Sequence, residues 1–262
     1  MGLDARERRA VARWRPRSTW INRRLAWLVI TGSQWVMTRR NRLEVDGKER
    51  LDALQERGDR GLLTYSNHVS RLDDPLLISN LGLADLPYDR MRWVSADALK
   101  LFDTTLSAYI FSAGKCVPTV RGGGLDQPAL EFLSDRLQQG EWVHIFPEGG
   151  ANRDPEPHLR QPFKAGIGRL IDQARPLTLP FFHLGMEHVA PHRKGPQRGH
   201  RVKVLFGEAT DCDDAFVDAL GGAADDQRAD SQRTRWDAIS HWAYGVLAEL
   251  ESRIEGHRSS ER

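Results

Sequence analysis

The chain has 262 residues, of which 40% are apolar and 28% are charged, and its formal net charge is +2. This length and composition exclude a disordered protein and predict one large globular domain or two small ones. Two cysteines, Cys116 and Cys212, are too few for a disulfide framework and favour a reducing compartment. No run of about 18 or more apolar residues is present, so the sequence predicts no membrane-spanning helix.

Positive charge is concentrated at the start of the chain. Residues 1–42 contain eleven arginines against two acidic residues, a local excess of +9, although the whole chain carries only +2. A basic segment on an acidic body favours docking on an anionic surface, either lipid or nucleic acid. Nucleic acid is the weaker interpretation because no recognised binding module accompanies these arginines.

Residues 1–44 form a predicted leader that also holds four of the eight tryptophans. Its pattern predicts a helix over residues 19–38 with Ser18 as the cap. Tryptophans favour the headgroup layer and arginines reach phosphates, so such a helix would lie in a membrane interface without crossing it. The candidate membrane-binding residues are Trp20, Arg23, Arg24, Trp27, Leu28 and Trp35. The alternatives are a helix packed on the body and a cleaved targeting segment, which the acidic residues weaken.

Residues 45–220 alternate predicted helices and strands. A short helix over 49–57 comes first, and a buried strand over 61–66 then runs directly into Asn67 and His68. Asp74-Pro75 predicts the start of a helix over 76–81. Further strands are predicted over 92–95, 116–120, 142–146, 177–182 and 202–206, and further helices over 126–138 and 166–174. This alternation predicts an α/β domain with helices on the faces of a sheet.

Residues 221–262 complete the chain as a predicted linker and closing helix. Residues 221–230 are small and polar and have no apolar face. The helix that follows has an apolar stripe at helical spacing, which predicts that it covers the body. The stripe consists of Trp236, Ile239, Trp242, Val246, Leu247 and Leu250.

His68 and Asp73 form the first candidate catalytic pair. Residues five apart on one helix point about 140° away from each other, so these two meet only if the chain turns between them. The strand end before His68 and the helix start at Asp74-Pro75 supply such a turn. An aspartate that accepts one ring N–H leaves the other ring nitrogen to take a hydroxyl proton. The alternative is that Asp73 only caps a helix.

The chemistry around His68 favours direct attack by a substrate hydroxyl. Ser66 and Ser70 flank His68 but lack the Gly-x-Ser-x-Gly setting of a nucleophile, which disfavours a covalent acyl-enzyme. Water in place of the hydroxyl would make a hydrolase, and the sequence leaves that open. His144 alternates with buried strand residues and is predicted to be structural. His188 and His192 have no third ligand, so we expect no metal.

Two other strand ends carry candidate binding residues. Phe146-Pro147-Glu148-Gly149 offers a hydroxyl acceptor in Glu148 and close backbone approach at Gly149. Arg121 precedes three glycines and suits a phosphate, and Lys164 stands just before a helix where it can also meet phosphate. The alternatives are a simple turn, a mobile surface loop and a solvated lysine.

Five segments in this order resemble the glycerolipid acyltransferases, and most closely their tafazzin-like members. They are residues 66–75, 114–118, 142–149, 163–171 and 179–186, within a resemblance that covers about residues 45–210. The resemblance implies a mixed β-sheet flanked by helices, with His68 as the base and Asp73 as its orienting partner. It implies that Arg121 belongs to the phosphate-binding second motif and that Glu148 and Gly149 form the third. The candidate substrate-binding residues are then Asn67, Arg121, Glu148, Gly149 and Lys164.

Two features depart from the family pattern. Gly150 stands where many members have a side-chain donor, so any phosphate contact there comes from the backbone. The segment after Arg121 is short and rich in glycine, which leaves the acyl acceptor open. Tafazzin-like enzymes exchange acyl chains between phospholipids and lysophospholipids, including cardiolipin, without free coenzyme A, whereas the wider family uses acyl-CoA or acyl-carrier protein.

The sequence therefore predicts a peripheral membrane acyltransferase that uses phospholipid and lysophospholipid, binds no nucleic acid and needs no cofactor. The alternatives are an acyl-CoA-dependent 1-acylglycerol-3-phosphate acyltransferase, a non-catalytic lipid-binding protein and a lipase. The preponderance of arginine over lysine, 32 to 6, suggests a GC-rich genome and the cytoplasmic face of a bacterial inner membrane; a mitochondrial membrane is the alternative. The oligomeric state is not predicted.

Overall fold

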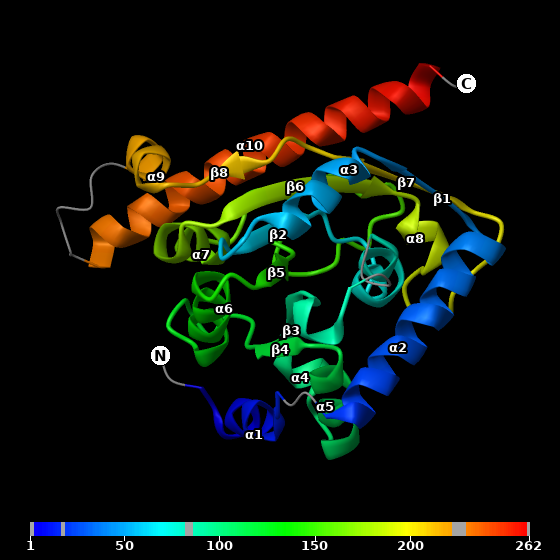
Figure 1. Ribbon diagram of the computed structural model, residues 1–262, viewed down its shortest axis with the longest axis horizontal. Helices are drawn as coiled ribbons and strands as arrows, with labels where there is room; N and C mark the ends of the chain where they lie inside the picture. Colours follow the sequence, from blue (N-terminus) through cyan, green and yellow to red (C-terminus); the bar gives the residue numbers. More distant parts are fainter. Residues whose placement is uncertain (1–2, 17–18, 82–85, 222–228, 261–262) are drawn as a thin grey trace.

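The computed structural model describes residues 3–16, 19–81, 86–221 and 229–260. A twisted sheet lies at the centre, the long helix α10 runs along one side of the molecule, and α2 lies at another edge (Figure 1). The sheet order is β1-β7-β6-β2-β5-β3-β4, and β8 pairs with β6. The strands are β1 Arg42–Asp46, β2 Leu62–Ser66, β3 Trp93–Asp97, β4 Cys116–Thr119, β5 Trp142–Ile145, β6 Leu177–Leu184, β7 Arg201–Phe206 and β8 Thr210–Asp211.

The strands pair in parallel except where β6 meets β7 and β8. The predicted mixed sheet flanked by helices is therefore confirmed. The α-helices are α1 Ala5–Arg13, α2 Trp20–Gln34, α3 Lys48–Ala53, α4 Ala98–Leu101, α5 Thr105–Ala113, α6 Pro128–Gln138, α7 Gly166–Ala174, α8 Met186–Val189, α9 Asp214–Gly221 and α10 Ala229–Ser260.

The central strand β2 places the site. All five of its residues are buried, as expected for a strand covered on both faces of a parallel sheet. It pairs in parallel with β5 and with β6, and Tyr65 lies opposite Ile145. The carboxyl ends of β2 and β5 therefore lie side by side at one edge of the sheet. The residues that follow these ends, His68 and Glu148, are brought together there.

The leader folds differently from the expectation in two details. The α-helical part of α2 ends at Gln34, and Trp35–Arg40 continues as a wider π-helical turn. The helix is capped by Thr19, whose side chain accepts a hydrogen bond from the amide of Asn22. Ser18, the predicted cap, lies outside the described residues, as does most of the predicted linker over 221–230.

The helix predicted over 76–81 does not form as a regular α-helix. Asp73–Leu77 is a π-helical turn that begins three residues earlier, and Ile78–Asn80 is a 3₁₀ turn. The side chain of Asp74 does not cap this turn, because its carboxylate accepts hydrogen bonds from the Arg92 guanidinium at 2.5–2.9 Å. Asp73 instead accepts the backbone amides of Val69 and Ser70, so the turn is organised around the candidate catalytic carboxylate.

The helix α10 packs against α7, α9 and β6. Its buried side chains recur at intervals of three and four, namely Ile239, Ala243, Leu247, Leu250 and Ile254. Trp236, Trp242 and Val246 of the predicted stripe are only half-buried. Among the described helices, none is both long enough and apolar enough to cross a membrane.

Candidate active site

His68 and Asp73 face each other at the end of β2. The Nδ1 atom of His68 lies 2.9 Å from Oδ2 of Asp73. The same oxygen accepts the amides of Val69 and Ser70, each at 2.9 Å, and the Asp73 side chain is fully buried. An ionised carboxylate can only accept, so the proton of this contact resides on Nδ1 and leaves the lone pair of His68 on Nε2.

The His68 ring is held in place while one edge stays accessible. It stacks on Phe146, with ring centroids 4.1 Å apart and an angle of 21° between the planes. Its side chain is 15% exposed. Within the described part of the chain, no residue makes a hydrogen bond to Nε2. This nitrogen is therefore free to accept a proton from a bound hydroxyl.

Glu148 supports His68 through the backbone. Its Oε1 accepts the amide of His68 at 2.8 Å, and its Oε2 accepts the amide and Nε of Arg160 at 3.3 and 3.2 Å. Burial raises the pKa of Glu148, and the bonds from His68 and Arg160 oppose that rise. A carboxylate has about four acceptor positions, so three protein donors leave room for one bond to a ligand.

Asn67 is occupied by the sheet. Its Nδ2 donates to the carbonyl of His183 at 2.9 Å, and its Oδ1 accepts the amide of His183 at 3.0 Å. The ring Nε2 of His183 lies 3.0 Å from the carbonyl of Asn67 and 3.8 Å from Oδ2 of Asp73. Both side chains are buried. The Asn67 side chain thus fastens the end of β2 to β6, and His183 lies behind the candidate pair.

A cavity of about 490 Å³ is lined by Glu148, the residue that accepts the amide of His68. It includes three predicted binding residues, Arg121, Glu148 and Gly149. It also includes the cations Lys100, Arg153 and Arg160, which the sequence analysis did not select. The sequence feature that could have identified them is their position after strand ends. Lys100 follows β3, and the two arginines follow the Phe-Pro-Glu-Gly segment after β5. Four cations in one cavity form a site suited to a phosphate group.

Arg121 is positioned by one carboxylate and one glycine. Its Nε lies 3.0 Å from Oδ2 of Asp97, and half of its side chain is exposed. A Cβ atom at Gly150 would lie 2.7 Å from Nη1 of Arg121. The glycine that departs from the family pattern therefore gives the arginine the space it occupies.

Lys164 does not line the cavity, although it lies near it. It is exposed, and its amide donates to the carbonyl of Pro147 at 2.9 Å. Its stem packs over Gly149, where an added Cβ would lie 3.1 Å from Cγ of Lys164. His144 is fully buried, as its pattern predicted, and burial holds its pKa well below the ordinary value.

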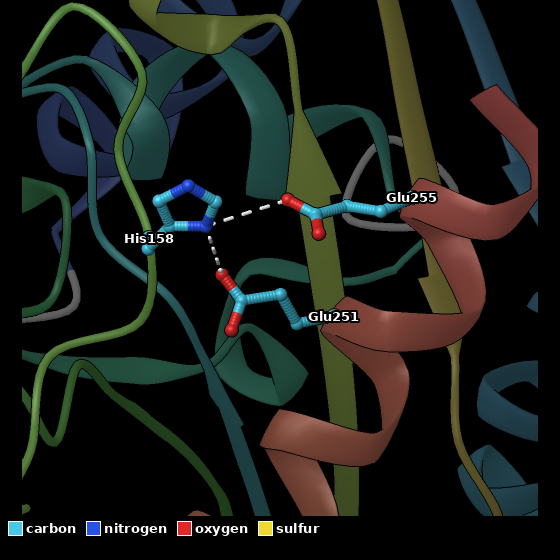
Figure 2. Close-up of side chains that lie close together, drawn as sticks. All are labelled: His158, Glu251 and Glu255. Atoms are coloured by element: carbon cyan, nitrogen blue, oxygen red, sulfur yellow. Dashed lines mark ion pairs between the residues drawn. The ribbon is translucent and has the colours of Figure 1, made fainter. Parts of the chain in front are cut away.

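The segment between Glu148 and Lys164 is tied to the rest of the protein at both sides. Asn152 donates its amide to the carbonyl of His68 at 2.6 Å and its Nδ2 to the carbonyl of His158 at 2.9 Å. The ring of His158 lies between two carboxylates of α10, with Nδ1 3.4 Å from Glu251 and 3.5 Å from Glu255 (Figure 2). The segment that lines the cavity is thus fastened to α10 at one end and to His68 at the other.

The family of this chain follows from comparison with known proteins. The acyltransferase family model matches residues 42–184, which include β2, β5 and the residues that follow them. The match covers more than half of the chain, and the protein therefore belongs to the acyltransferase family.

Within this family the chain is similar to tafazzins. Tafazzin of Drosophila melanogaster is 37% identical over 186 residues, which are 68% of this chain and 48% of that protein. N-acylphosphatidylethanolamine synthase of Arabidopsis thaliana is 36% identical over 162 residues, 58% of this chain and 56% of that one. The chain thus spans about half the length of the curated relatives it matches. The 1-acyl-sn-glycerophosphate acyltransferase PlsC of Thermotoga maritima aligns with a TM-score of 0.49 at 18% identity, over 87% of this chain and 80% of that one.

Proposed function

We propose that this protein transfers a fatty acyl group to the hydroxyl of a lysophospholipid, with a phospholipid as the acyl donor. The observation that carries the proposal is the His68–Asp73 pair, in which Nε2 of His68 makes no hydrogen bond to the described residues. The pair is joined to a cavity that contains four cations by Glu148, which lines the cavity and accepts the amide of His68. Membership of the acyltransferase family and similarity to tafazzin support the reaction class.

The reaction needs one proton relay. Nε2 of His68 takes the proton of the acceptor hydroxyl, and the acceptor oxygen forms a bond to the acyl carbonyl carbon. The tetrahedral intermediate then breaks the ester bond to the donor, and His68 returns the proton to the departing oxygen. Asp73 keeps the ring in the required tautomer and stabilises the positive imidazolium between these two steps.

The remaining residues bind or position. Arg121, together with Lys100, Arg153 and Arg160, holds the phosphate of the lipid, and Lys164 adds positive charge outside the cavity. Glu148 holds the backbone of His68 and offers its remaining acceptor position to the glycerol. Gly149 lets the lipid approach the backbone, and Asn67 acts by fixing the end of β2.

The leader docks this enzyme on an anionic membrane surface as a peripheral protein. Trp20, Trp27, Leu28 and Trp35 are exposed large apolar side chains, and Arg24 is exposed beside them. Arg23 forms an exposed ion pair with Asp89 at 2.7 Å. We place the protein on the cytoplasmic face of a bacterial inner membrane.

A transfer assay tests the reaction. Purified protein is incubated with a phospholipid carrying a labelled acyl chain and an unlabelled lysophospholipid, without coenzyme A, and the products are separated by mass spectrometry. Labelled acceptor in the wild type and none in His68→Ala is the expected result. Transfer that occurs only after addition of acyl-CoA would show that acyl-CoA, and not phospholipid, is the acyl donor. Release of free fatty acid would indicate a lipase. A second acceptor, phosphatidylethanolamine, is included because one relative is named an N-acylphosphatidylethanolamine synthase.

A further inference from the structure

The helix α5, between β3 and β4, exposes three of its four large apolar side chains, while the fourth, Phe111, is half-buried against the core. Leu106, Tyr109 and Ile110 are exposed, Leu106 by 70%, and their spacing of three and four places them on one face. The opposite face, which is buried, carries the smaller Ala108, Ser112 and Ala113. No charged residue occurs in this helix. A surface helix in water has the reverse arrangement, with its larger apolar residues turned inward.

The helix α2 shows the same inversion. Its buried positions are Asn22, Ala26, Ile30 and Ser33, most of them small or polar. Its exposed positions include Trp20 at 74% and Trp27 at 57%, together with Ile21, Leu28 and Val29. No charged residue occurs between Arg24 and Arg39. Exposed apolar side chains on two helices indicate that this part of the protein surface contacts an apolar environment.

The two helices are neighbours. They contact each other directly, and α5 lies beside the N-terminal end of α2 (Figure 1). The hydroxyl of Tyr109 donates to Oδ1 of the buried Asn22 at 3.0 Å. Ser112 accepts the amide of Arg15 from the leader at 3.3 Å. The helices α2 and α5 are therefore fixed relative to each other, although about eighty residues separate them in the sequence.

The charges at the ends of α2 match an anionic lipid. Arg24 is exposed near its start, and Arg39 and Arg40 are exposed at the end of the π-helical turn that follows it. The guanidinium of Arg40 lies 5.1 Å from the ring centroid of Trp35. In such an arrangement the arginines can bind headgroup phosphates, while the tryptophans and the uncharged apolar side chains between them enter the membrane interface.

We propose that α5 is a second membrane-inserting element, which acts with α2 to dock this protein on anionic phospholipid. The docking surface consists of the exposed side chains of Trp20, Ile21, Trp27, Leu28 and Val29 on α2 and of Leu106, Tyr109 and Ile110 on α5. The inference rests on the proposed membrane association of the leader and extends it to a helix inside the acyltransferase domain. Two inserted helices fix the orientation of the protein on the membrane, whereas a protein held by α2 alone could tilt about the axis of that helix.

The first test removes apolar surface without changing charge. Leu106→Gln combined with Ile110→Gln is compared with Thr105→Gln, a matched control at an exposed polar position of the same helix. Binding is measured by co-sedimentation with vesicles of phosphatidylcholine and phosphatidylglycerol. The partition coefficient of the double variant should fall about tenfold or more, since the exposed parts of the two side chains together change such an equilibrium by at least about that factor. The control should bind like the wild type.

The second test locates the face directly. Cys116 and Cys212 are buried, so a cysteine at position 106 can be labelled selectively with an environment-sensitive fluorophore. On the same vesicles the emission of the Leu106→Cys conjugate should shift to shorter wavelength. A conjugate at Arg253→Cys on α10, on the opposite side of the molecule (Figure 1), should not shift. A shift at neither position, or full vesicle binding by the double variant, overturns the inference.

Two further outcomes separate this inference from the transfer reaction. If the wild type is a dimer without lipid and the double variant is a monomer with unchanged vesicle binding, the face joins two copies and the inference is wrong. His68→Ala should bind vesicles like the wild type although it transfers no acyl group. If α5 does not insert into the vesicles, the transferase proposal is unaffected. If His68→Ala still transfers acyl groups, the proposed docking surface is unaffected.

Discussion

Replacing Asp73 by asparagine tests the catalytic pair most directly. The substitution keeps the size of the side chain and an oxygen for the amides of Val69 and Ser70, which now approach Oδ2 at 2.9 Å. It removes the negative charge beside the His68 ring. Two unit charges about 4 Å apart interact by about 4 kcal/mol at an effective dielectric constant of 20. Since about 1.4 kcal/mol is a factor of ten in rate, the loss of imidazolium stabilisation should lower kcat by about a thousandfold.

The neighbouring carboxylate supplies the control. Asp74 binds Arg92 at 2.5–2.9 Å and does not contact His68, so Asp74→Asn should lower stability by about 1–3 kcal/mol and leave kcat close to that of the wild type. Transfer is measured with saturating lysophospholipid, and folding by thermal unfolding with circular dichroism. Equal effects of the two substitutions on kcat, in folded proteins, would refute the role of Asp73.

Two further predictions concern the cavity and its support. Arg121→Ala should raise KM for the lysophospholipid about tenfold or more through the loss of a charged hydrogen bond, while Arg136→Ala, whose guanidinium binds Glu141 outside the cavity, should not. Burial raises the pKa of Glu148 above its ordinary value of 4.5, so its protonated form stabilises the fold below pH 4.5 and that contribution is lost as the pH rises through the raised value. In urea titrations, the unfolding free energy of the wild type minus that of Glu148→Gln should therefore fall as the pH rises from 4.5 through the raised pKa. A difference that does not depend on pH would contradict the raised pKa of Glu148.

The sequence predicted the central strands well because burial on both faces leaves a simple pattern. The strands expected over 61–66 and 142–146 are β2 and β5 within one residue at each end. Polar residues directly after such strands must gather at one edge of the sheet, and His68 and Glu148 do so. The edge strand β1 was not predicted, although its residues alternate in polarity, because it is short and largely charged.

Contacts between residues that are far apart in the chain could not be predicted from the sequence. Arg160 binds Glu148 from a segment that has neither the helix nor the strand pattern of apolar residues. Nothing in the neighbouring sequence distinguishes Arg160 from other surface arginines. The helix α5 was missed for a different reason. Three of its four large apolar residues are exposed, so a pattern search that assumes a polar side facing water does not find this helix.

Removing residues 1–40 looks like the natural test of membrane docking, but the structure argues against it. Ile30 and Met37 are buried in the core with strands β6 and β7, and Ser33 donates a hydrogen bond at 2.8 Å to the carbonyl of Leu76 in the turn that begins at Asp73. Burial of two such apolar side chains contributes about 3–6 kcal/mol, a large part of the 5–15 kcal/mol that stabilises a typical domain. The truncated protein should therefore unfold at markedly lower temperature and lose transfer activity together with vesicle binding. Trp27→Gln, which changes an exposed side chain of the same helix, should lower vesicle binding without lowering the melting temperature. A truncated protein as stable as the wild type would show that α2 is an appendage and not a part of the core.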